Sequence, residues 1–161
     1  MGFFSCRLWK NQYRVEDVIE GAHGILTSVT LPPERYVELA EFEDQNPGNF
    51  IGAWFHTRPG QGLLLSAPSA RTQAGHQAAN PNAFCLIFDH TRLDSQNLGF
   101  SLHRLHSPSR LTSYEILDYQ LENITLDLLA HGLVLFLRSP FPVKTLFDAI
   151  KGKNHYNLEI K

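Results

Sequence analysis

Short apolar runs and amphipathic stretches alternate along this chain. Residues 13–20 mix β-branched and charged side chains before Gly21, which is typical of a strand that runs into a turn. Residues 84–88 form an unbroken apolar run, which predicts a central strand covered by helices on both faces, and residues 89–92 are expected to leave the sheet. Periodicity over so few residues leaves a helix open for residues 114–121. Together these patterns predict strands at residues 13–20, 25–30, 50–56, 84–88, 99–105 and 114–121.

Four other stretches carry helix signals. Pro33 lies in the first turn of the first predicted helix, where proline is well tolerated. Ser66 is placed to cap the second, with Pro68 in its first turn. The third has apolar side chains at positions i, i+3, i+4 and i+7, and the fourth ends at Gly152. The predicted helices cover residues 31–44, 68–79, 126–137 and 143–151.

This alternation of strands and helices predicts an α/β fold. With 161 residues and no internal repeat or interdomain linker, the chain is expected to be one domain over residues 1–161. Within it, residues 1–110 would hold the motif-bearing core, and residues 111–161 a C-terminal strand and helices.

Composition excludes several classes of function. Lys and Arg number 14 against 16 Asp and Glu, so no general attraction to nucleic acid or to an anionic membrane is expected. Two cysteines are too few for a disulfide framework or a structural zinc site. The longest apolar stretch is shorter than the roughly 20 residues that a bilayer requires, and the N-terminus lacks a signal-peptide pattern. We therefore expect a cytoplasmic protein.

One segment carries a recognisable motif. In it, His56-Thr57-Arg58-Pro59 is followed after six residues by Ser66 and, three positions later, by Ser69. This segment resembles the signature His-x-His-Pro, six residues, Ser-x-x-Asp of the MPN (JAMM) family of metallo-isopeptidases. The flanks agree, because residues 80–84 and 89–92 look like the family's next strand and its "DPTR" turn. The resemblance implies a mixed β-sheet flanked by helices in α-β-α layers.

The family's zinc centre is not matched. In that family two histidines at i and i+2 of a strand and a helix-start aspartate hold zinc, and a glutamate acts as general base. Here His56 matches the first histidine, but Arg58 stands for the second and Ser69 for the aspartate. An arginine has no lone pair for a metal. The glutamate usually precedes a strand that matches Met1-Gly2-Phe3-Phe4, so the base has no counterpart.

Other residues do not rebuild the site. His76 lies about two helical turns, roughly 10 Å, beyond Ser69. His103 and His106 are three apart on a predicted strand and so face opposite ways. Cys85 sits inside an apolar run and is expected to be a small hydrophobic residue. No catalytic residue, metal ligand or cofactor is therefore predicted, and zinc enters only if His56 joins a rebuilt site.

The motif positions also have ordinary structural explanations. His56 is expected to be a strand histidine bonded to backbone, and Ser66 a helix cap. Arg58 is expected to form a structural ion pair with an acid. Alternatively, its planar guanidinium would bind a ligand carboxylate through two hydrogen bonds, in the cleft where the family holds its metal.

The leading hypothesis is a catalytically inactive MPN-domain scaffold or regulatory protein that acts through protein–protein association. Its partner would be another MPN-domain subunit or a second copy of the chain. A zinc-dependent isopeptidase acting on ubiquitin-like conjugates is the alternative, and binding of an anionic ligand at Arg58 is the third. The apolar helix over residues 126–137 is the predicted interaction surface, through Leu126, Leu129, Leu133 and Phe136.

Overall fold

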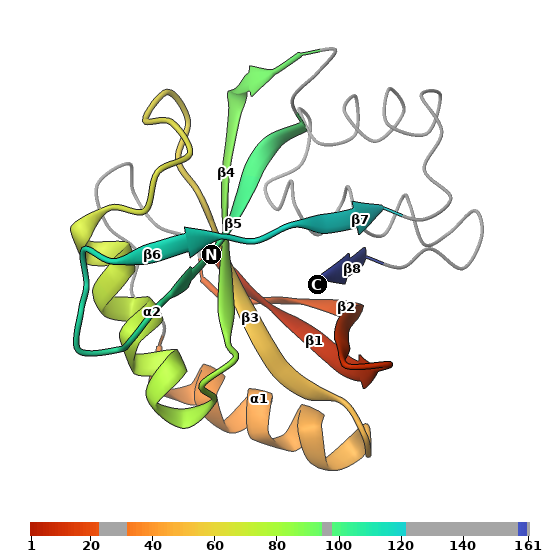
Figure 1. The fold of residues 1–161 in the computed structure, drawn as a ribbon. Coiled ribbons are helices and arrows are strands. Elements are labelled where there is room, and N and C mark those ends of the chain that lie inside the picture. Colours follow the sequence, from red (N-terminus) through yellow and green to blue (C-terminus); the bar gives the residue numbers. More distant parts are fainter. Residues whose placement is uncertain (23–31, 95–97, 122–157, 161) are drawn as a thin grey trace.

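The computed structural model describes residues 1–22, 32–94, 98–121 and 158–160. Figure 1 shows these residues as a mixed sheet with two helices, so the predicted α/β class is confirmed. The elements are β1 (Gly2–Trp9), β2 (Gln12–Glu20), α1 (Pro33–Gln45), β3 (Phe50–Thr57), α2 (Ala67–Ala79), β4 (Phe84–Leu93), β5 (Leu98–Leu105), β6 (Tyr114–Ile116), β7 (Tyr119–Leu121) and β8 (Leu158–Ile160).

The strands form one sheet in the order β6-β5-β4-β3-β1-β2-β8-β7. Strands β3 and β4 pair in parallel, and every other neighbouring pair is antiparallel. A parallel pair needs a crossover connection, and here α2 supplies it. The motif segment is therefore the loop that leaves β3 and the start of the crossover helix.

One stretch of chain joins the two ends of the sheet. Strand β6 pairs with β5 at one end, and β7 pairs with β8 at the other, although the two strands follow each other closely in sequence. Figure 1 shows this stretch passing across the other strands. Between the strands, buried Leu117 donates its N–H to the carbonyl of Leu102 at 2.9 Å. The single strand predicted at residues 114–121 is therefore wrong, because the chain turns inward at Leu117.

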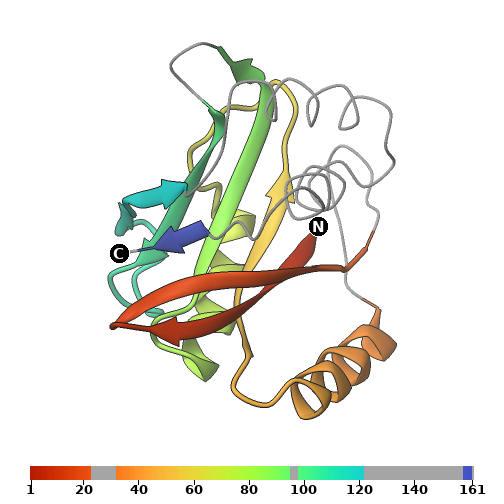
Figure 2. The same cartoon turned by 90° about the vertical axis from the view of Figure 1, so that its right-hand side faces the viewer.

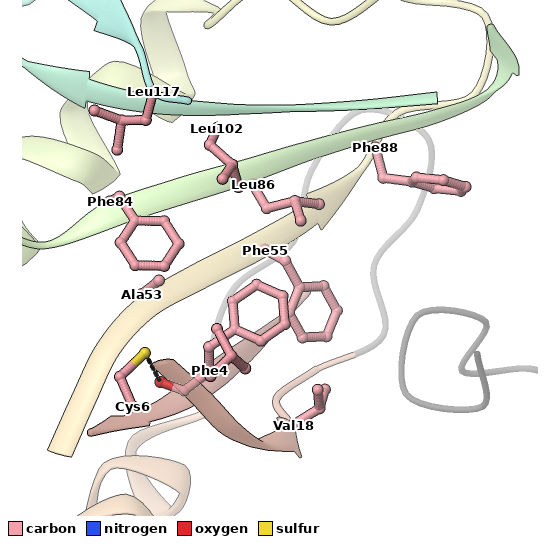
Figure 3. Packing of buried hydrophobic residues seen from close by; sticks show 11 residues of the cluster. Phe4, Cys6, Val18, Ala53, Phe55, Phe84, Leu86, Phe88, Leu102 and Leu117 are labelled. Atoms are coloured by element: carbon pink, nitrogen blue, oxygen red, sulfur yellow. Dashed lines mark hydrogen bonds between the residues drawn. The ribbon is translucent and has the colours of Figure 1, made fainter. Parts of the chain in front are cut away.

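The two faces of the sheet carry separate apolar clusters. On one face, Leu39 of α1 and Ala70 of α2 pack with side chains such as Trp54 of the sheet. On the other face, a cluster packs without these two helices, and Figure 3 shows its side chains on β1 to β5 turned toward one another. Its labelled members are Phe4, Cys6, Val18, Ala53, Phe55, Phe84, Leu86, Phe88, Leu102 and Leu117. Both described helices therefore contribute to the same cluster, so α-β-α layering is not established by them.

Strand β4 lies between β3 and β5 and contributes to both clusters. Phe84, Leu86 and Phe88 belong to one, whereas Cys85 and Ile87 belong to the other, as the two-residue period of a strand requires. The central position of β4 and its burial on both faces are confirmed, but both described helices contribute to one of the two clusters and neither contributes to the other. The expected exit from the sheet after residue 88 is wrong, because β4 continues to residue 93 with a break in its register against β5.

Other sequence predictions fared unevenly. The predicted strands near β2, β3 and β5 and the helices near α1 and α2 are confirmed within a few residues. The hydrophobic pattern predicted neither β1 nor β8. The strand predicted at residues 25–30 lies outside the described residues. So do the helices at 126–137 and 143–151, with the predicted interaction residues Leu126, Leu129, Leu133 and Phe136.

Candidate functional site

The four motif residues lie where β3 ends and α2 begins. His56 is the next-to-last residue of β3, and Arg58 follows the strand. Ser66 is the N-cap of α2, and Ser69 lies in its first turn. The structure thus places the motif on the strand, loop and helix that its spacing predicts.

Arg58 is tied into the loop that follows it. Its Nη1 donates to the carbonyl of Leu64 at 2.8 Å, and its Nη2 to Oε1 of Gln61 at 3.2 Å. Its backbone N–H donates to the carbonyl of Phe88 at 2.7 Å. The ion pair expected from the sequence is replaced by two neutral acceptors among the residues described. The guanidinium thus closes its own loop, and it has no lone pair for a metal.

The two serines bond to each other. Ser66 Oγ and Ser69 Oγ are 2.9 Å apart, and the backbone N–H of Ser69 donates to Ser66 Oγ at 3.3 Å. This is the capping geometry of a helix N-terminus, so the predicted role of Ser66 is confirmed. Ser69 is buried, and its hydroxyl is neutral where the family motif has a carboxylate.

His56 is a half-buried neutral imidazole. Burial, together with the positive charges of the Met1 ammonium group and of Arg58, lowers its pKa to about 4. Its ring lies 6.4 Å from the ring of Trp54, measured between centroids. A neutral imidazole can bind a metal, but one such ligand beside a cation does not make a zinc site.

The loop between Arg58 and Ser66 is anchored by Asp89 of β4. The Asp89 carboxylate accepts the backbone N–H of Gly60 at 2.9 Å and that of Gly62 at 2.8 Å. It also accepts the N–H and the hydroxyl of Thr91, at 3.0 and 2.6 Å. Burial by itself raises the pKa of Asp89, but these hydrogen bonds outweigh it and hold the pKa well below its usual range. Asp89 therefore stays charged and holds the loop.

Both glycines in this anchor have a backbone that other residues rarely adopt. Gly60 has a φ of 73° and Gly62 a φ of 77°, in the left-handed region. A Cβ at Gly60 would meet no other atom within 4 Å, so conformation rather than space calls for glycine there. The sequence signals for this anchor are the Gly60-Gln61-Gly62 spacing and the aspartate that directly follows the apolar run of residues 84–88.

Strand β5 holds the same loop from the other side. The carbonyl of Leu63 accepts from Ser101 Oγ at 2.9 Å and lies 2.8 Å from Nε2 of His103. Because a carbonyl only accepts, Nε2 must carry the ring proton. Burial lowers the pKa of His103, while its bond to Leu63 partly opposes that shift. His103 is therefore a buried structural histidine, whereas His106 is exposed beyond the end of β5, as their spacing predicted.

A buried polar network fixes α2 to the sheet. Gln73 accepts the indole N–H of Trp54 at 2.8 Å and donates to Gln77 at 2.9 Å and to the carbonyl of Ala83 at 2.7 Å. Gln77 accepts the N–H of Leu105 at 2.8 Å and donates to the carbonyl of the same residue at 2.9 Å. The amide of Gln77 therefore pairs with the end of β5 as a neighbouring strand would. Both glutamines are polar, so the hydrophobic pattern of this helix gives no sign that they are buried.

The residues around the motif do not fit zinc. No group of three or more His, Cys, Asp or Glu that could hold a metal occurs in the parts of the chain that the structure describes. His76, excluded as a substitute ligand, stacks on Trp54 at 6.2 Å between ring centroids. Cys6 and Cys85 are both buried, and burial raises the pKa of Cys6 to about 12 and that of Cys85 further still. Neither thiol would readily form the thiolate that zinc requires.

Comparison with known proteins adds no assignment. No protein-family model matches the chain, and no curated protein matches it significantly. Among the described helices, neither is long and apolar enough to cross a membrane.

Proposed function

We propose that this protein is a catalytically inactive MPN-type domain that acts as a scaffold or regulatory subunit through protein–protein association. The motif resemblance motivates the proposal, and the geometry around Arg58 carries it. A guanidinium bonded to Leu64 and Gln61 stands at the second-histidine position. A metal ion brought to that position would meet a fixed positive charge instead of a lone pair.

The loop would have to be rebuilt before it could hold an ion. Arg58, Asp89 and the pair Ser101 and His103 each bond to its backbone, at Leu64, at Gly60 and Gly62, and at Leu63. A loop with this many side-chain anchors is ordered without any ligand. Its role in the proposed function is that of a rigid support, since a partner loses little entropy when it docks on a preorganised surface.

Exposed apolar side chains support association. Leu64, in this loop two residues before Ser66, is 67% exposed, and Ile116 on the edge strand β6 is 62% exposed. Four further large apolar residues are exposed elsewhere on the described surface. Side chains of this kind are common on surfaces when scattered, but a rigid loop that presents one offers a ready contact for a partner protein.

The proposal is tested by zinc content and peptidase activity, measured on the wild-type protein and on a double variant, Arg58→His with Ser69→Asp. We expect far less than one zinc per wild-type chain and no cleavage of ubiquitin-like conjugates. The double variant restores two ligand types and serves as the positive reference for metal uptake. One zinc per wild-type chain with isopeptidase activity would refute the proposal and establish the enzymatic alternative.

A further inference from the structure

The turn between β1 and β2 forms a basic and apolar tip. Residues 7–14 contain three basic residues and no acid. Leu8 is 56% exposed and Trp9 is 49% exposed. The Lys10 Nζ lies 5.9 Å from the centre of the Trp9 ring, and Arg14 Cζ lies 5.6 Å from it, which is cation–π range. We call these residues the hairpin tip.

The shape of the hairpin tip is fixed by its turn. Lys10 and Asn11 both have positive φ, at 47° and 64°, which is the pattern of a two-residue type I′ hairpin turn. Strand pairing continues to the last pair, Trp9 with Gln12. The indole is therefore presented on an ordered support rather than on a loose loop.

Helix α1 presents the opposite combination. It carries five acidic residues and one basic residue in 13 positions. Tyr36 is 58% exposed and Val37 is 59% exposed, while Leu39 points into the core. By the 3.6-residue period, Glu34 and Glu41 lie on the same side of the helix as Val37, and both are exposed. The outer face of α1 is thus acidic and apolar.

We propose that the hairpin tip of one molecule docks on the outer face of α1 of a second copy of this chain. The two surfaces hold four of the six large apolar side chains that are exposed in the described part of the chain. Their charges are opposite, although the whole chain is nearly balanced at 14 basic and 16 acidic residues. Such segregation of charge onto two apolar surfaces supplies both contact area and complementarity.

The contact must form between molecules. Figure 2 shows the β1–β2 turn pointing away from α1, although Arg7 near its base bonds to Asn49, four residues beyond the end of α1. One chain therefore cannot close the contact on itself, and two copies joined in this way each keep one surface unused. A heterologous contact of this type adds further copies or closes into a ring. This inference deepens the proposed function by naming the partner, and its chemistry does not depend on the absence of zinc.

A charge exchange between the two surfaces tests the proposal. The tip variant is Arg7→Glu with Lys10→Glu, and the helix variant is Glu34→Lys with Glu41→Lys. All four positions are exposed, and the side-chain interactions affected are the surface hydrogen bond from Arg7 to Asn49 and the contact of Lys10 with the Trp9 ring. Each variant alone should self-associate about tenfold more weakly than the wild type, because two attractive contacts become repulsive. An equimolar mixture of the two variants should associate again, because the acidic tip of the first variant then meets the basic helix face of the second.

Sedimentation over a range of protein and salt concentrations gives the readout. The wild type should associate more strongly at low salt, where surface charges are least screened. Arg71→Glu with Arg110→Glu is the control for the tip variant, because it makes the same change in net charge at exposed positions outside both surfaces. Wild-type protein that stays monomeric at every concentration overturns the inference. So does self-association that neither variant weakens, or a mixture that fails to restore it. None of these outcomes changes the result expected for zinc content, which tests the proposed function separately.

Discussion

The helices α1 and α2 have the same length and contribute to one apolar cluster, yet they are held in opposite ways. In α2, Ser69, Ala70, Gln73 and Gln77 are buried, and the two glutamines bond to the sheet. In α1, Leu39 is buried while Tyr36 and Val37 face outward. Helix α2 is therefore fixed to the sheet and supports the motif, whereas α1 leaves its outer face exposed and available to a partner.

The largest effect should come from removing the amide that anchors α2. In Gln77→Ala, the buried N–H and carbonyl of Leu105 lose their partner, and Gln73 loses one acceptor. Leaving such groups unsatisfied should lower the free energy of unfolding by about 3 kcal/mol. Chemical denaturation measures it, with Arg71→Ala on the exposed side of α2 as the control, expected within about 0.5 kcal/mol of wild type. A loss equal to that of the control would contradict the proposed anchoring.

The next largest loss of stability should come from Leu39, the buried residue of α1. Leu39→Ala should cost about 2 kcal/mol, at the low end for a buried leucine, because the helix can settle into the space. Val37→Ala on the exposed face should change stability little while weakening self-association. Amide hydrogen exchange should show α1 opening before α2 in the wild type. Equal protection of the two helices would remove the distinction drawn between them.

The loop that enters α2 should depend on the charge of Asp89. In Asp89→Asn, one oxygen becomes an NH₂ group, which cannot accept an N–H, so one glycine donor is left without its partner. We expect a loss of about 1–2 kcal/mol at neutral pH. Because the pKa of Asp89 is depressed in the folded state, its contribution is present above the ordinary carboxyl pKa and lost as pH falls below it. The variant should therefore lose less stability on acidification, and an acid titration that gives parallel curves would refute this.

The smallest effect should come from His56. Its pKa in the folded state, about 4, lies below the ordinary histidine value, so the unfolded chain binds a proton first. Stability should therefore fall as pH decreases from about 6.5 toward 4. His56→Gln should flatten this part of the pH profile, as measured by denaturation at pH 5 and pH 7.5. His106→Gln, at an exposed position, is the matched control and should leave the slope unchanged.

Local signals in the sequence were enough for most elements of the described core. Alternating and unbroken apolar runs located β2, β3, β4 and β5, and proline and serine signals located the starts of α1 and α2. They failed where the outcome depended on distant partners. The segment at residues 114–121 reads as one strand, but it divides because β6 and β7 pair with opposite ends of the sheet.

For the candidate site, too, some properties follow from the sequence and others only from the tertiary structure. Side-chain chemistry alone determined that Arg58 offers no lone pair and that Ser69 offers no carboxylate, whatever the fold. Which groups hold the loop was not readable, because Asp89 reaches Gly62 across 27 positions and His103 reaches Leu63 across 40. Periodicity reports what a residue does within its own helix or strand. Only the tertiary structure brings distant donors and acceptors together, and so it decided that the loop after β3 is held from both β4 and β5.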